Sequence, residues 1–82
     1  MKTIEELKIE LTEIFERLHY INEKIEIENV VEFEQIIVFE CIDKLLYDNK
    51  EKFNVIYSKN SKRFLTCDGE DYITFWENIN NL

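Results

Sequence analysis

The chain has no alanine, no proline and only one glycine, Gly69, among its 82 residues. The residue types encoded by GC-rich codons are thus scarce, which indicates an AT-rich genome such as that of a low-GC bacterium, its phage or a large virus. No stretch rich in proline, glycine or serine separates two parts of the chain, and no repeat occurs. At this length a second hydrophobic core has no room, so residues 1–82 are predicted to form a single domain.

Cysteines and long apolar runs are also few. Cys41 and Cys67 lack the CxxC spacing of a zinc site and are too few for a disulfide framework, so both are predicted to be reduced and buried as small hydrophobic residues. The longest aliphatic or aromatic run, Ile36 to Phe39, is far too short to span a membrane, and the N-terminal residues lack the apolar core of a signal peptide. We therefore expect a cytoplasmic protein without membrane contact.

Catalytic and ligand-binding motifs are absent as well. The sequence contains no glycine-rich phosphate loop and no evident nucleophile with its base, so we expect no enzyme activity, no cofactor and no metal. Glu16 and His19 have the Glu-x-x-His spacing of a di-metal helix bundle, but that site needs two such pairs and the chain has one histidine. His19 is therefore interpreted as a surface residue, and Glu70 and Asp71 as carboxylates in the first turn of a helix.

Charge of one sign dominates. Eighteen acidic residues face ten basic ones, which gives a net charge of −8, while 45% of the residues are hydrophobic and supply a core. Residues 1–48 and 66–82 are acidic, and residues 49–65 form a basic segment between them. A surface of this charge repels phosphate backbones, so direct nucleic-acid binding is disfavoured and a protein with a basic surface is the favoured partner.

The firmest local prediction is a long N-terminal helix. Isoleucine and leucine recur with a 3-4-3-4 spacing from Ile4 to Ile25, which is typical of a heptad seam. Thr3 and Glu6 form a capping box at its start. The helix is predicted to run from about Thr3 to about Asn22–Glu26.

The next segment has an ambiguous pattern. Residues 24–28 alternate like an additional short strand, but apolar side chains between Val30 and Tyr47 spread nearly all round a helical wheel. Because no glycine or proline interrupts this segment, we predict a second, central helix from about Asn29 to Asp48.

The C-terminal part is predicted to hold a two-stranded antiparallel hairpin and a short helix. The strands are residues 53–57 and 63–67, with Asn60 able to adopt positive φ in the turn. Asp68 is expected to cap the last helix, whose apolar face comprises Tyr72, Phe75, Trp76 and Ile79. The predicted fold class is therefore α+β with the order αα-ββ-α.

The candidate site is the outer face of the N-terminal helix. On the heptad its acidic residues point away from the seam, with apolar Ile9 and the ring of Tyr20 among them, as the centre of an interface requires. Such a carboxylate stripe either is merely solvated or imitates a nucleic-acid backbone and docks on a basic groove. The predicted partner-binding residues are Glu6, Ile9, Glu13, Glu16, Tyr20, Glu23 and Glu26.

No motif in the chain matches a family. In general character, being short, acidic, free of alanine and α+β, it resembles inhibitors encoded by phages and mobile elements, including anti-CRISPR proteins and DNA mimics, and the immunity proteins that neutralise toxins. The resemblance implies a protein-binding inhibitor that occupies a basic groove of a nuclease or other nucleic-acid-binding protein.

Two alternatives stay open. The chain is an immunity protein or antitoxin against a toxin, or an oligomerisation or adaptor module in which the heptad seam and the Tyr72, Phe75 and Trp76 face join copies or partners. A monomer and a homodimer fit the sequence equally well. A third reading, in which the basic hairpin with Tyr57 and Phe64 binds single-stranded nucleic acid, is weaker because acidic regions surround it.

Overall fold

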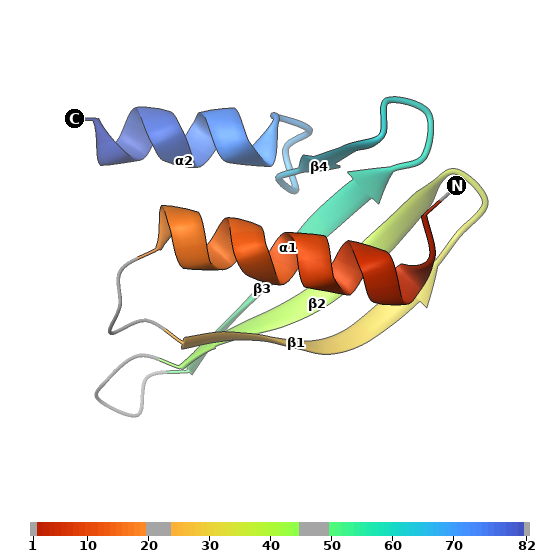
Figure 1. The fold of residues 1–82 in the computed structure, drawn as a ribbon, viewed down its shortest axis with the longest axis horizontal. Coiled ribbons are helices and arrows are strands. Elements are labelled where there is room, and N and C mark those ends of the chain that lie inside the picture. The colour runs from red at the N-terminus through yellow and green to blue at the C-terminus, as the bar shows by residue number, and fades with distance from the viewer. Residues whose placement is uncertain (1, 20–23, 45–49, 82) are drawn as a thin grey trace.

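The computed structural model describes residues 2–19, 24–44 and 50–81, and this part of the chain has an α+β fold (Figure 1). Helix α1 spans Ile4–Leu18 and helix α2 spans Tyr72–Asn80. One four-stranded antiparallel sheet with the order β1-β2-β3-β4 lies between them in the sequence. Its strands are β1 (Lys24–Glu32), β2 (Ile36–Lys44), β3 (Lys50–Ser58) and β4 (Arg63–Leu65).

The core lies between α1 and one face of the sheet. On α1, the buried side chains of the seam are Leu7, Leu11, Ile14 and Leu18. They pack against alternate residues of β2, β3 and β4, which are Ile37, Phe39, Cys41, Val55, Tyr57 and Phe64. The seam is thus used within the chain, against the sheet.

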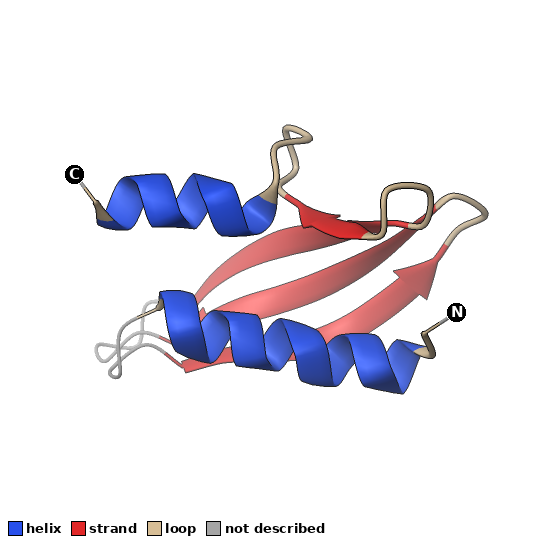
Figure 2. Cartoon of the chain, turned by 45° about the horizontal axis from the view of Figure 1, so that its top comes forward, coloured by secondary structure: helices blue, strands red, loops and turns tan. Residues whose placement is uncertain are grey.

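Helix α2 lies beside α1 on the same side of the sheet (Figure 2). Its first residue, Tyr72, is buried in the core, where its ring centroid lies 5.9 Å from that of Phe15. Asp71 caps this helix by accepting a hydrogen bond from the Thr74 amide at 3.0 Å. The prediction that Asp68 is the cap was wrong, since residues 68–70 form the turn before it.

The prediction of a central helix over residues 29–48 was wrong, and with it the order αα-ββ-α. In the described residues this segment is the end of β1, a turn and strand β2, with no helix. The turn at 33–35 contains no glycine or proline and closes through a hydrogen bond from the Phe33 amide to the Ile36 carbonyl at 2.8 Å. Its β-branched residues favour strands, and the apolar side chains that spread round a helical wheel lie instead on both faces of β2.

Two further boundaries differ from prediction. Helix α1 ends at Leu18, and residues 24–26 belong to β1, so the suggested strand at 24–28 is part of a longer one. In the β3–β4 turn, Lys62 and not Asn60 carries the positive φ, of 56°. The Lys62 amide donates to the Ser58 carbonyl at 2.8 Å, which closes the turn.

The β1–β2 and β3–β4 turns are linked by polar contacts. Lys59 is central, since its ammonium binds the Glu32 carboxylate at 2.8 Å and the Phe33 carbonyl at 2.7 Å. Its amide donates to the Gln35 carbonyl at 3.0 Å. One cation of the basic hairpin is thus engaged with an acidic residue of its own chain. No helix in the described part of the chain is long and apolar enough to cross a membrane.

Candidate protein-binding site

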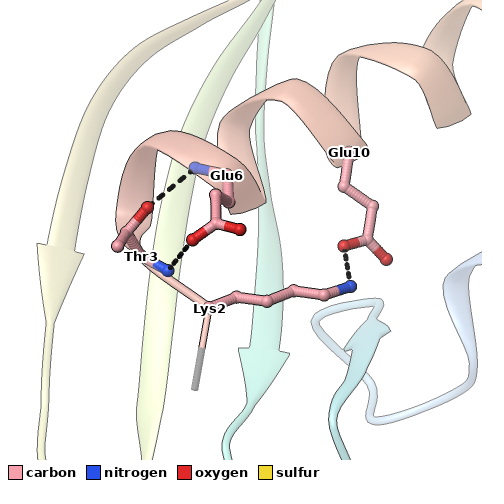
Figure 3. Close-up of polar contacts among 4 residues, drawn as sticks. All are labelled: Lys2, Thr3, Glu6 and Glu10. Carbon is pink, nitrogen blue, oxygen red and sulfur yellow. Dashed lines mark hydrogen bonds and ion pairs between the residues drawn. The ribbon is translucent and has the colours of Figure 1, made fainter.

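The outward side of α1 begins with a complete capping box (Figure 3). The Thr3 hydroxyl accepts a hydrogen bond from the Glu6 amide at 3.2 Å, and the Glu6 carboxylate accepts one from the Thr3 amide at 3.0 Å. These bonds satisfy two amides that a helix otherwise leaves unpaired. The hydrogen bond from the Thr3 amide lowers the pKa of the Glu6 carboxyl, so Glu6 is ionised and held by the helix terminus.

An isolated apolar side chain lies at the centre of this side. Ile9 is 61% exposed, the highest value among the large hydrophobic residues that the structure describes. Residues three, four and seven positions away share its helix face, and four of these six positions are glutamates, the others being Thr12 and Lys2, which precedes the helix. We call this set the acidic helix face, and it consists of Glu5, Glu6, Ile9, Thr12, Glu13 and Glu16.

The glutamates of the acidic helix face differ in how far they are engaged. Glu5 lies 3.7 Å from the Lys8 ammonium, a weak exposed contact. The Glu6 carboxylate accepts the hydrogen bond from the Thr3 amide in the capping box. Glu13 and Glu16 are exposed, and within residues 2–19, 24–44 and 50–81 neither takes part in an ion pair or hydrogen bond. These two are therefore the carboxylates available to an external cation.

A further ion pair lies just outside this face. Lys2 binds the Glu10 carboxylate (Figure 3), and this hydrogen bond raises the pKa of the Lys2 ammonium. Its partner Glu10 is thereby neutralised within the chain. Both side chains are exposed, so the pair adds little stability.

The structure brings together four of the seven predicted partner-binding residues, Glu6, Ile9, Glu13 and Glu16. Tyr20 and Glu23 lie outside the described residues. Glu26 lies on β1, where it pairs with the Lys44 ammonium at 2.9 Å, and so does not continue the stripe along the helix. Glu5 was not in the predicted set, although its i, i+4 spacing to Ile9 already places it there.

His19 is partly buried and is not the surface residue that we expected. Its Nε2 lies 3.0 Å from the Tyr72 hydroxyl, and its ring centroid lies 4.6 Å from that of Trp76. Since Glu16 points to solvent, the Glu-x-x-His pair forms no site. No group of three histidine, cysteine or carboxylate side chains in the described ranges is placed to hold a metal ion.

Next to His19 is a cleft of about 310 Å³ that the sequence did not predict. Its walls combine the rings of α2 with the start of β3 and the segment after β4, including Phe53, Cys67 and Trp76. The expected burial of Cys67 was wrong, because this thiol is exposed. The apolar spacing of Tyr72, Phe75 and Trp76 was the only signal for this cleft.

Cys41, in contrast, is buried as predicted, with 2% of its surface exposed on the core face of β2. Burial raises the pKa of its thiol to about 12. The thiol is therefore neutral at physiological pH and unsuited to nucleophilic chemistry.

No protein-family model, curated protein or solved structure matches the chain.

Proposed function

We propose that the protein is a stoichiometric, protein-binding inhibitor that uses the acidic helix face to occupy a basic groove of a nuclease or another nucleic-acid-binding protein. The observation that carries this proposal is the arrangement around Ile9: a side chain 61% exposed, with four glutamates on the same side of a well-capped helix. An apolar centre with a charged rim is the usual anatomy of a protein interface.

In the acidic helix face, the glutamates of the rim and the isoleucine at the centre contribute to binding in different ways. Glu13 and Glu16 attract lysine and arginine side chains at long range and so raise the association rate. Ile9 contributes affinity by leaving water when it enters an apolar recess among those cations. Because the helix is capped and packed against the sheet, its backbone is ordered before binding, which limits the entropy lost on association.

Partners of two kinds fit this chemistry equally. A phage-encoded or mobile-element inhibitor would cover the nucleic-acid channel of a defence nuclease, and an immunity protein or antitoxin would cover the corresponding groove of a toxin. Both kinds present lysine and arginine to phosphate, and both would accept a row of carboxylates in its place.

The test uses three variants of the full chain. Immobilised wild type, E13K/E16K, I9T and a matched control, E28K/E34K, are each used to capture proteins from a lysate of the source cell. The control carries the same charge change at two exposed glutamates in β1 and the β1–β2 turn, away from the acidic helix face. Any captured protein is then purified, and its affinity for each variant is measured by calorimetry.

We expect one captured protein to bind wild type and E28K/E34K equally, and to bind E13K/E16K and I9T at least about tenfold more weakly. The same protein should lose nucleic acid when wild type is added. Equal affinity for all four proteins contradicts the proposed role of the acidic helix face, and retention of nucleic acid contradicts inhibition.

A further inference from the structure

The register of the sheet aligns one apolar residue from each strand on the side that faces away from α1. Val31 pairs with Val38, Val38 with Ile56, and Ile56 with Leu65, so these four form a continuous row across the sheet. Each alternates with a core residue of its strand and therefore points away from the core. We call this side the outer sheet face, and its other members include Glu26, Asn29, Ile36, Glu40, Ile42, Lys52, Asn54, Ser58 and Arg63.

The row is not part of the hydrophobic core. Its four residues are half-buried and belong neither to the buried cluster nor to the hydrophobic residues packed against it. Ile42 on the same face is already buried by its own chain, with 4% of its surface exposed, so the open part of this face is the end that carries the row. Both helices lie on the opposite side of the sheet (Figure 2), so within the described residues no element covers the row.

The sequence of β2 is that of a strand covered on both sides. An antiparallel strand with one solvated face alternates apolar and polar residues, whereas strands with two covered faces read as nearly continuous apolar runs. β2 begins with Ile36, Ile37, Val38 and Phe39 and continues to Cys41 and Ile42, so its outward positions are apolar at three of the first four places. Such a strand indicates that something covers the outer sheet face.

The charged side chains of the outer sheet face bear on what covers it. The charged side chains described on this face are mixed, with Glu26 and Glu40 against Lys44, Lys52 and Arg63. Glu26 and Lys44 already neutralise each other. The charges described on this face nearly balance, and the register places the remaining lysines, Lys24 and Lys50, level with Lys44 at the end of the face away from the row. In a chain of net charge −8, two copies can therefore approach through the end that carries the row without strong repulsion.

We propose that two copies of the chain pack through their outer sheet faces. A two-fold axis parallel to the strands, between β2 and β3, lays Val38 of one copy over Ile56 of the other and Val31 over Leu65. The same operation lays Glu40 over Asn54, so the central rows superpose no like charges. A face made of three nine-residue strands and the three residues of β4 covers roughly 400 to 600 Å² per copy, which lies at the lower end of specific interfaces. The dimer should therefore be weak and depend on protein concentration.

This assembly has a consequence for binding. Face-to-face sheets place the two α1 helices on opposite outer sides, so both acidic helix faces stay open. A dimer would then hold two partner molecules or bridge two grooves of one assembly. This bivalency rests on the proposed function, whereas the dimer itself does not.

The dimer is tested first on the wild-type chain. Sedimentation equilibrium from low-micromolar to millimolar concentration should show a reversible monomer–dimer transition. In a mixture of ¹³C-labelled and unlabelled protein, isotope-filtered NOE spectra should show intermolecular contacts between the methyl groups of Val38 and Ile56. A monomer at every concentration overturns the proposal, and so does a dimer whose intermolecular contacts involve Ile9 or Trp76 instead.

Substitution then gives an independent measurement. V38T/I56T keeps β-branched side chains that suit strands but removes apolar surface from the centre of the row. We expect its dissociation constant to rise at least tenfold, while I9T, the matched loss of an exposed isoleucine on the helix, leaves it unchanged. Unchanged dimerisation in a folded V38T/I56T contradicts the proposal, and if that variant does not fold, the wild-type NOE pattern decides.

Discussion

The acidic helix face and the outer sheet face lie on opposite sides of one core and differ in how charge and apolar surface are distributed. The helix face has a single exposed isoleucine among glutamates, two of which lack a partner within the described residues. The sheet face has a row of four half-buried aliphatic residues among charges of both signs. Charge of one sign suits a partner of opposite charge, whereas a neutral apolar face suits a second copy.

The difference follows from which positions each element must give to the core. On α1 the seam residues fill the core, and the exposed positions carry four glutamates together with Ile9, Thr12 and Arg17. On β2 every second residue enters the core, and the remaining positions carry valine and isoleucine where a solvated sheet would carry polar residues. Residues 2–19, with five acidic and three basic side chains, carry only −2 of the net charge of −8, so the helix face is distinguished by the grouping of its glutamates and not by the total charge of its element.

The largest effect is expected from the core that joins the two faces. Leu11 is completely buried between α1 and the sheet, so L11A should lower the free energy of unfolding by about 3 kcal/mol through lost burial and a residual cavity. Urea titration followed by circular dichroism measures this. Because the helix face depends on this packing, partner binding should weaken together with stability; a loss below about 1 kcal/mol would show that α1 is not held as described.

Raising the salt concentration should weaken partner binding at the helix face but not dimerisation through the sheet face. Screening weakens attraction between the glutamates and a basic partner, so partner affinity should fall roughly tenfold between low and high ionic strength. The same screening reduces repulsion between copies of net charge −8, so dimerisation should be unchanged or stronger. Calorimetry and sedimentation in the same buffers compare the two. A dimer that dissociates as salt rises would show that ion pairs hold it.

Loss of the capping box should have a smaller effect, confined to the helix face. T3A removes the hydroxyl that accepts from the Glu6 amide but keeps the backbone amide that donates to the Glu6 carboxylate, and it should cost about 1 kcal/mol of stability. Thermal unfolding measures the change, and T12A, at an exposed helical threonine, is the matched control. If the dimerisation constant also moves, the two faces are more strongly coupled than the structure indicates.

The smallest effect concerns pH and the inner side of β2. The pKa of Cys41 is raised to about 12 from an ordinary value of 9.0, so the folded state keeps the thiol proton when the unfolded state loses it. Stability from this group is complete below pH 9 and declines as pH rises from 9 toward 12. Between pH 9 and pH 12 the free energy of unfolding should therefore fall more steeply for wild type than for C41A. C67A, which lacks only an exposed thiol, should behave as wild type.

Helical periodicity predicted much of α1 and of its outward face. The seam, the capping box and the grouping of Ile9 with Glu13 and Glu16 all follow from a 3.6-residue repeat. The seam gave a wrong prediction only at its C-terminal end, where it extended the helix to Ile25. That residue does pack against the core, but from strand β1, so its helical spacing is a coincidence that also carried Glu26 onto the wrong element.

The sheet could not be predicted to the same degree. The β1–β2 turn contains Phe33, Glu34 and Gln35 and none of the residues that usually mark a turn, so nothing local divided the segment. The spread of apolar residues that suggested a buried helix is the signature of β2 itself, which is apolar on both faces. Only long-range pairing with β1 and β3 decides between these readings, and a pattern along one segment does not contain that pairing.

The most direct test of the account is the affinity of one purified basic partner, captured as described above, for E13K/E16K and for E28K/E34K. The two variants have the same net charge, so any difference between them reports where the carboxylates lie. The account predicts at least about a tenfold loss for E13K/E16K and wild-type affinity for E28K/E34K. Equal losses in both would contradict it, since the partner would then respond to total charge and not to the acidic helix face.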